Sequence, residues 1–427
     1  MMFPLEILEI ILSKCDGKTL LNARKSCTDL RGIVDYLAEK TRLWEWCCRE
    51  EIPNEQLVEY LPKYEGCGKE KWLNMYINWY SWEKIEKLTI LEPVRCPLNL
   101  SKISCVAVSS HHIAIGSEDG RLKIFTQHWR PFFEHRIVAV KITNLTFIGY
   151  NDYCSDDLND LDMCLVVAFP NGLSIFAFKD SQSFKIDIDG IKSHSVFRNY
   201  ICYEKVGGRL TIIKISNLID RRRVQEIWFA RVYSPSWITC YKMWNGTCTF
   251  LINTTIKSLS YDTPTITPLE EMQKVTDLWF YAPLMINSSV TKIYRDNVII
   301  NVYKNNVTTW SPHRDIMEDY IEIVILDKET HFSKKLFNML EIFKCNITCI
   351  FLYGNLLLIG TDCGELYYYH ISNWKNIDLK QYNHRQIVGR HPIIAIAVKE
   401  FEKERRFYVS SRFAIHEVAG FMPNVYP

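Results

Sequence analysis

Hydrophobic and polar residues follow two different patterns along the chain. Up to about residue 82, apolar residues recur three or four positions apart, which is typical of helices. Beyond about residue 83, short apolar runs alternate with polar positions and are separated by turn residues, which is typical of strands. We therefore expect a small all-α region followed by a larger all-β region.

The first apolar run starts at Pro4 and reaches Leu12. Proline suits the first position of a helix because its φ is already helical and it leaves no N–H unpaired. Apolar residues occupy more than one side of the run, whereas a surface helix of a monomer usually carries one apolar stripe. Asp16-Gly17 is expected to end the helix, with the glycine as a left-handed cap.

Two more short helices are predicted, over about residues 19–26 and 29–39. Three short helices in roughly forty residues are too small to bury this much hydrocarbon by themselves. A partner surface is the simplest explanation. The alternative is a helical cap that packs on its own chain.

Residues 3–46 resemble an F-box, the module that joins a substrate receptor to a cullin-type ubiquitin ligase. The resemblance is carried by the Pro-x-Glu-Ile-Leu run from Pro4, the Leu-Leu pair, the following cysteine and the closing Leu-Trp. Phe3 stands where the family usually has Leu, and Leu30 stands near its usual Trp. The resemblance implies a Skp-adaptor interface made of Pro4, Leu5, Leu8, Ile11, Leu12, Leu20, Leu21, Cys27, Leu30, Leu43 and Trp44.

Residues 49–83 are predicted to form a helical linker after an F-box domain over residues 1–48. The linker combines helical spacing with many aromatic residues, and Pro62 and Gly66-Cys67-Gly68 interrupt it. A rigid linker would hold a bound target at a set distance from the F-box.

Two clear hairpins are predicted, one at the start of the β region and one near its end. In the first, apolar strands flank the turn Asp119-Gly120, a strong hairpin signal. A similar unit recurs around Cys363. Both resemble WD-repeat units, in which a Gly-Ser-x-Asp-Gly turn joins the second and third strands of a propeller blade, although no Trp-Asp dipeptide occurs.

Weaker hairpins are centred on Asn171-Gly172, Gly207-Gly208, Thr254, Asn305-Asn306 and Ser411. The seven centres are separated by roughly 35 to 60 residues, the period range of propeller blades. We expect a multidomain chain in which residues 84–427 form an all-β seven-bladed propeller. Residues 85–91 would supply the outer strand of the last blade and so close the ring. A pair of β-sandwiches is the alternative.

Composition adds few constraints. The 427 residues are 48% hydrophobic with a formal charge of +2, which predicts neither disorder nor binding to nucleic acid or membranes. The start of the sequence does not look like a signal peptide, and the 15 cysteines are most simply reduced, buried thiols. We expect a cytoplasmic protein, with the nucleus as the alternative.

A search for catalytic motifs favours a non-enzymatic adaptor without a cofactor. Gly17-Lys18-Thr19 lacks the first glycine of a phosphate-binding loop, and no Gly-x-Ser-x-Gly elbow occurs. Cys345 and Cys349 could bind a metal, but packing at a strand entry explains them as well.

Four residues are candidates for a target-binding face. Arg231, Tyr233, Arg385 and Arg390 are predicted on the side of the propeller that carries the turns between second and third strands and the connections between blades. Guanidinium groups there suit an acidic or phosphorylated target; scattered surface arginines are the alternative. Arg221–Arg223 and the acidic run between Asp152 and Asp162 are read as solvated loops on the opposite face.

The sequence thus predicts the substrate-recognition subunit of a Skp–cullin–F-box ubiquitin ligase. Its F-box would bind the Skp adaptor and, through it, a cullin, and its propeller would bind the target protein. A non-ligase propeller scaffold for protein interactions is the alternative.

Overall fold

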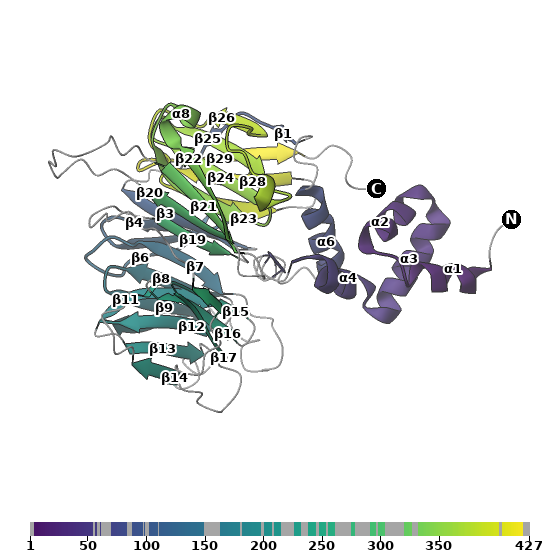
Figure 1. Ribbon diagram of the computed structural model, residues 1–427, viewed down its shortest axis with the longest axis horizontal. Helices are drawn as coiled ribbons and strands as arrows, with labels where there is room; N and C mark the ends of the chain where they lie inside the picture. The colour runs from purple at the N-terminus through teal and green to yellow at the C-terminus, as the bar shows by residue number, and fades with distance from the viewer. Residues whose placement is uncertain are drawn as a thin grey trace.

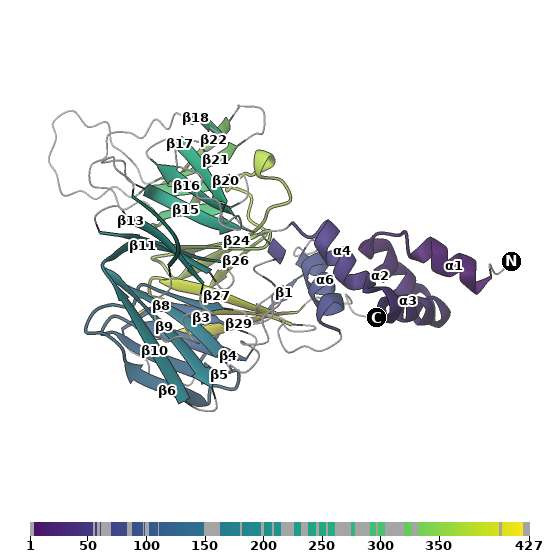
Figure 2. The same ribbon diagram turned by 90° about the horizontal axis from the view of Figure 1, so that it is seen from below.

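The computed structural model places a group of helices on one side and a large β region on the other, with the N-terminus at the far end of the helices (Figures 1 and 2). The structure describes residues 4–53, 56–57, 60, 70–82, 88–96, 98, 102–109, 111–148, 163–179, 182–197, 200–206, 209–214, 226–231, 238–244, 247–252, 255–260, 275–277, 291–295, 298–303, 320–326, 332–400 and 404–421. In that part of the chain no helix is both long enough and apolar enough to cross a membrane.

The N-terminal helices are α1 (Leu5–Leu12), α2 (Gly17–Ser26), α3 (Thr28–Thr41), α4 (Leu43–Glu51) and α6 (Lys71–Trp82). Side-chain caps start two of them: the Asp16 carboxylate accepts from Thr19 N at 2.8 Å, and Cys27 Sγ accepts from Leu30 N at 3.4 Å. The expected left-handed cap at Gly17 is wrong, because Gly17 is the first residue of α2. A Cβ there would lie 2.4 Å from Tyr76 Cζ, so the glycine allows close contact between α2 and α6.

The described residues of the β region form six four-stranded sheets and one five-stranded sheet, all antiparallel. The first three sheets contain β3 (Ile103–Val108), β4 (His112–Ser117), β5 (Arg121–Thr126) and β6 (Pro131–Arg136); β7 (Asn144–Ile148), β8 (Met163–Phe169), β9 (Gly172–Lys179) and β10 (Gln182–Asp189); β11 (Ile191–Phe197), β12 (Tyr200–Lys205), β13 (Arg209–Lys214) and β14 (Glu226–Arg231). The next three contain β15 (Ile238–Trp244), β16 (Thr247–Ile252), β17 (Thr255–Ser260) and β18 (Val275–Asp277); β19 (Thr291–Arg295), β20 (Val298–Tyr303), β21 (Tyr320–Leu326) and β22 (Phe332–Asn338); β23 (Ile347–Tyr353), β24 (Leu356–Thr361), β25 (Glu365–His370) and β26 (His384–Ile387). The last sheet contains β27 (Ala395–Glu400), β28 (Glu404–Ser410), β29 (Ile415–Phe421), β1 (Thr89–Ile90) and β2 (Val94–Arg95); short helices α8 (Met339–Phe343) and η6 (Trp374–Asn376) lie between strands.

The predicted change from helices to paired strands is confirmed. Four of the predicted hairpin turns, at Asp119-Gly120, Asn171-Gly172, Cys363 and Ser411, lie in the described residues and join paired strands. The turns at 207–208, 254 and 305–306 lie outside the described residues, although the strands before and after each one pair.

Neighbouring sheets pack face to face, in the manner of propeller blades. Strands β3–β5 share a core with β7–β9, and strands β7–β10 share one with β11–β13. Strands β20 and β21 pack on β23–β25, and the last sheet packs on β3–β5. The first strand of most sheets lies beside the first strand of the next, and β27 lies beside β3. The β region therefore has a propeller-like arrangement rather than that of two sandwiches (Figures 1 and 2).

The last sheet takes strands from both ends of the β region. Thr89 pairs with Phe421, and Val94 pairs with Glu417. Leu91 N also donates to Ala419 O at 2.8 Å. The pairing falls at the end of the segment for which a closing strand is predicted, and continues past it into β2; residues 83–87 lie outside the described residues.

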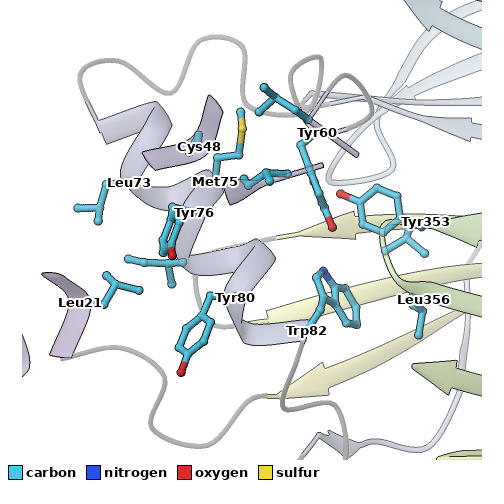
Figure 3. Close-up of a cluster of buried hydrophobic side chains, with 14 of the residues drawn as sticks. Leu21, Cys48, Tyr60, Leu73, Met75, Tyr76, Tyr80, Trp82, Tyr353 and Leu356 are labelled. Carbon is cyan, nitrogen blue, oxygen red and sulfur yellow. The ribbon is translucent and has the colours of Figure 1, made fainter. Parts of the chain in front are cut away.

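The helices and the β region share one continuous hydrophobic core (Figure 3). The Trp82 ring, at the end of α6, lies 6.4 Å from the Tyr353 ring and 6.1 Å from the Phe407 ring. Gln56 Nε2 donates to Asn355 Oδ1 at 2.6 Å. Packed aromatic contacts of this kind fix the relative position of the two parts.

A buried polar network crosses the same junction. Arg405 is fully buried, and its guanidinium donates to Asn78 Oδ1 at 2.6 Å and to Ser81 Oγ, both on α6. Its Nε lies 4.0 Å from Glu400, which also accepts from the Trp82 indole N–H. Because removing one partner from such a network leaves a buried charge, the network favours a single orientation of α6 on the sheets.

Candidate functional site

Helix α1 exposes most of its apolar side chains. Leu5, Ile7, Ile10 and Ile11 are 55%, 42%, 61% and 47% exposed, and only Leu12 is buried. Solvent-exposed apolar clusters on a monomer mark interaction surfaces when they are contiguous.

The exposed side chains of α1 are neighbours on one side of the helix. Ile7 lies three positions from Ile10 and four from Ile11, so the three line one face. Leu8 and Leu12 lie on the other side and pack into the core that contains α3. The chain therefore covers one side of this helix and leaves Ile7, Ile10 and Ile11 to solvent. We call this set the α1 apolar face.

The predicted adaptor interface divides into three groups by burial. Pro4, Leu5, Ile11 and Cys27 are exposed. Leu8 and Leu30 are half-buried and pack against the core. The remaining five are buried inside this chain: Leu12, Leu20, Leu21, Leu43 and Trp44.

The expectation that a partner alone buries Leu12, Leu21 and Trp44 is therefore wrong. Helices α2, α3, α4 and α6 supply the apolar surface that covers them; for example, the Trp44 ring lies 5.7 Å from the Tyr76 ring. Conversely, Ile7 and Ile10 were missing from the predicted interface. Their three-residue spacing on a helix was the signal that could have identified them.

Contacts behind the α1 apolar face hold the helices in place. Arg24 on α2 forms an ion pair with Asp35 on α3 at 2.7 Å. Gly17 N donates to Glu51 Oε1 at 2.6 Å, and the Tyr76 hydroxyl donates to the other oxygen of the same carboxylate. Burial, followed by this bond to Glu51, raises the pKa of Tyr76, so the hydroxyl keeps its proton. The carboxylate thus ties the start of α2 to α6.

The F-box domain model matches residues 2–42. Residues 2–42 form an F-box domain. The F-box covers α1, α2 and α3, and its matched range ends at Arg42, the left-handed residue that caps α3. F-box domains bind Skp adaptors within Skp–cullin–F-box complexes and are generally non-catalytic. No curated protein matches the sequence of this chain.

Solved structures resemble the chain over most of its length, at low identity. The N-terminal domain of Nup159 is 11% identical with a TM-score of 0.50, over 78% of this chain and 95% of that domain. BamB from Moraxella catarrhalis is 11% identical with a TM-score of 0.45, over 80% of this chain and 99% of that protein. The Nup159 likeness concerns the fold, and it agrees with a propeller-type β region beyond the F-box.

Three of the four residues predicted for the target-binding face lie in the described part of the chain. Arg231 ends β14, opposite Arg209, and Tyr233 lies outside the described residues. Arg385 was expected in a connection between blades but lies in β26, where its guanidinium donates to Glu365 and stacks 5.7 Å from the Tyr367 ring centre. The bond to Glu365 raises the pKa of Arg385, so the pair is stable as an ion pair.

Arg390 lies on the connection between β26 and β27, as predicted, and lines a cavity of about 240 Å³. The other lining residues are Arg95, Val388, Gly389, His391, Ile393, Val409, Ser411, Phe413, Ala414 and His416. Arg221–Arg223 and the acidic run 152–162 lie outside the described residues.

Among the described residues, one cluster has the makings of a metal site. The ligand atoms of Cys345, Asp362 and Cys363 lie within 4.8 Å of one another. Cys349, the partner predicted for Cys345, is not part of it. Asp362 already accepts two hydrogen bonds from Asn346, at 3.1 and 2.7 Å, which accounts for its position as part of the turn.

Proposed function

We propose that this chain is the substrate-recognition subunit of a Skp–cullin–F-box ubiquitin ligase. The observation that carries the proposal is the α1 apolar face, which lies within the matched F-box and which the chain itself leaves exposed. A Skp adaptor would cover this face, and the propeller would hold the target. Such a protein would work in the cytoplasm or the nucleus.

In this proposal the chain positions the target protein and does not itself catalyse ubiquitin transfer. Ubiquitin transfer gains from holding the target close to the conjugating enzyme, because orientation replaces a bimolecular encounter. The shared core of α6 and the last two sheets, with the buried Arg405 network, supports a fixed distance between the F-box and the target.

We also propose that the seven sheets are the seven blades of one closed ring. Support comes from β27 lying beside β3 and from β1 and β2 pairing with β29. A ring closed in this way leaves the last sheet without an unpaired outer edge at β29.

The target is proposed to bind the face opposite the helices. The N-terminal region contacts Asn355 and Glu400, which lie at or just after the ends of the first strands of the last two sheets. The next turn of the last sheet, at Ser411, and the connection that carries Arg390 lie at the other ends of these strands. A target there would not compete with the adaptor.

The proposal is tested by co-purification with a Skp adaptor and binding measurements. Burying an isoleucine contributes about 1.5–3 kcal/mol, so Ile7→Asp combined with Ile11→Asp should weaken adaptor binding at least about a hundredfold. The melting temperature should stay the same because both side chains are exposed. Leu8 and Leu12 are unsuitable for this test because Leu12 belongs to the chain's own core.

Leu336→Asp combined with Leu340→Asp is the matched control. These two leucines are 60% and 47% exposed but lie on the β region, so the same chemical change should leave adaptor binding intact. Full adaptor binding by the Ile7/Ile11 double variant would reject the interface. Failure of the unmodified chain to bind any Skp adaptor would favour the alternative, a non-ligase propeller scaffold.

A further inference from the structure

The cavity lined by Arg390 brings together three separate segments of the chain. Arg95 comes from β2, Arg390 and His391 from the connection before β27, and Ser411 and His416 from the β28–β29 hairpin. It therefore lies where the first and last strands of the β region meet. We call it the seam cavity.

The floor and the rim of the seam cavity differ in chemistry. Val388, Ile393, Val409 and Ala414 are buried and apolar. Arg95, Arg390 and His391 are exposed and cationic or able to become so. The cavity is thus an apolar pocket with a positively charged mouth.

None of the described residues that line the seam cavity is acidic. Glu417, next to His416 in sequence, forms an ion pair with Arg406 at 3.0 Å, and Glu118 forms one with Arg412, next to Ser411, at 2.5 Å. Burial, followed by the charges of Arg95 and His391, lowers the pKa of His416, so these two side chains lie close enough to act on it.

Because the charged groups lie at the rim of the seam cavity and its floor is apolar, some anionic ligands fit it better than others. A phosphorylated side chain carries its charge at the tip, so entering this cavity would place the phosphate on the apolar floor, away from water. A C-terminal residue carries its carboxylate on the backbone and its side chain beside it. An apolar side chain could then fill the floor while the carboxylate stays at the rim, within reach of two guanidinium groups.

We propose that the seam cavity binds the C-terminal carboxylate of a polypeptide that ends in an apolar residue. A volume of about 240 Å³ suits one residue rather than a folded surface. The inference rests on the proposed function, since it names the chemical group of the target that is recognised. A C-terminal carboxylate replaces the acidic or phosphorylated segment as the ligand expected at Arg390.

The test uses the full chain in complex with its Skp adaptor, with isoleucine and valine methyl groups labelled for NMR. The probe is the peptide Gly-Ser-Gly-Ser-Gly-Leu with a free carboxylate; its C-terminal amide and a phosphoserine peptide with an amidated end are the comparisons. The signals followed are those of Ile393, Val388 and Val409. The free acid should shift them saturably, and the amide should bind at least about tenfold more weakly.

Three single variants sharpen the test. Arg390→Gln and Arg95→Gln should each weaken binding of the free acid by about tenfold. Arg385→Gln is the matched control: it removes an exposed arginine of the neighbouring sheet, on β26, that pairs with Glu365 and does not line the cavity, and should have no effect. The inference is overturned if acid and amide bind equally, if only the phosphopeptide shifts these signals, or if none does up to about 10 mM. Adaptor binding is measured on the same samples, so the inference can fail while the proposed function stands.

Discussion

Helices α1 and α6 are both rich in apolar residues, but the chain buries most of α6 and leaves most of α1 exposed. Helix α6 lies between α4 and the last two sheets, and eight of its twelve residues are buried. Helix α1 contacts α3 on one side and buries only Leu12. An apolar helix in a sequence therefore indicates that some surface covers it. Only the three-dimensional arrangement shows whether that surface belongs to the same chain.

The largest expected effect comes from truncating an aromatic residue of α6. Trp82→Ala should lower the free energy of unfolding by about 3–5 kcal/mol, because it leaves a cavity between Tyr353 and Phe407. Ile10→Ala on α1 should change it by less than about 0.5 kcal/mol, because the side chain is 61% exposed. Denaturant unfolding of both variants measures the difference. Similar losses of unfolding free energy would mean that α1 packs on the rest of the chain as extensively as α6 does.

A second prediction concerns the segment that follows α6 and pairs with β29. It tests how much this pairing stabilises the protein. Leu91→Pro removes the N–H that donates to Ala419 O at 2.8 Å, and should destabilise the protein by about 2–3 kcal/mol. Leu91→Ser keeps this N–H and is the control, since the leucine side chain is 45% exposed. Equal melting temperatures for the two variants would show that closure at this point contributes little.

The smallest effect concerns a sheet remote from the helices. Burial lowers the pKa of His194 on β11 from 6.5 to about 4. The unfolded chain then binds a proton more readily than the folded one, so stability falls as pH drops from 6.5 towards 4. Between pH 7 and pH 5 this histidine should account for about 1–2 kcal/mol of lost stability.

Unfolding midpoints at several pH values check the His194 prediction. His194→Gln should flatten the slope between pH 7 and pH 5, whereas His128→Gln, at an exposed site, should retain it. An unchanged slope in His194→Gln would assign the acid sensitivity to other groups. Adaptor binding should be the same in both variants.

The local part of the fold could be predicted from sequence because its signals are local. The Asp119-Gly120 turn forms as expected, with Ser117 Oγ accepting from Arg121 N at 2.8 Å and Gly120 at a positive φ. The F-box was found from short motifs, and its match spans residues 2–42. Burial was harder to predict: nothing near Trp44 in the sequence shows that Tyr76 covers it.

The candidate site on the β region was predicted only in part, for the same reason. Arg390 was identified from its place between strands, but its neighbours Arg95 and His416 lie far away in sequence. Arg385 was grouped with it because the two are close in sequence, although the strand β26 directs Arg385 to Glu365. The burial of Arg405 was not predicted, because its hydrogen-bond partners, Asn78 and Ser81, lie more than 300 positions earlier in the sequence.

The pairing of β1 and β2 with β29 also sets an order of events during synthesis. The partner of Thr89 is Phe421, so the last sheet cannot be completed on the ribosome until nearly the whole described chain has emerged. The F-box helices form contacts over short sequence distances and can fold long before that point. Under the proposed function, a nascent chain would therefore be able to bind its adaptor while the last sheet is still incomplete, and adaptor binding would precede target binding in the life of each molecule.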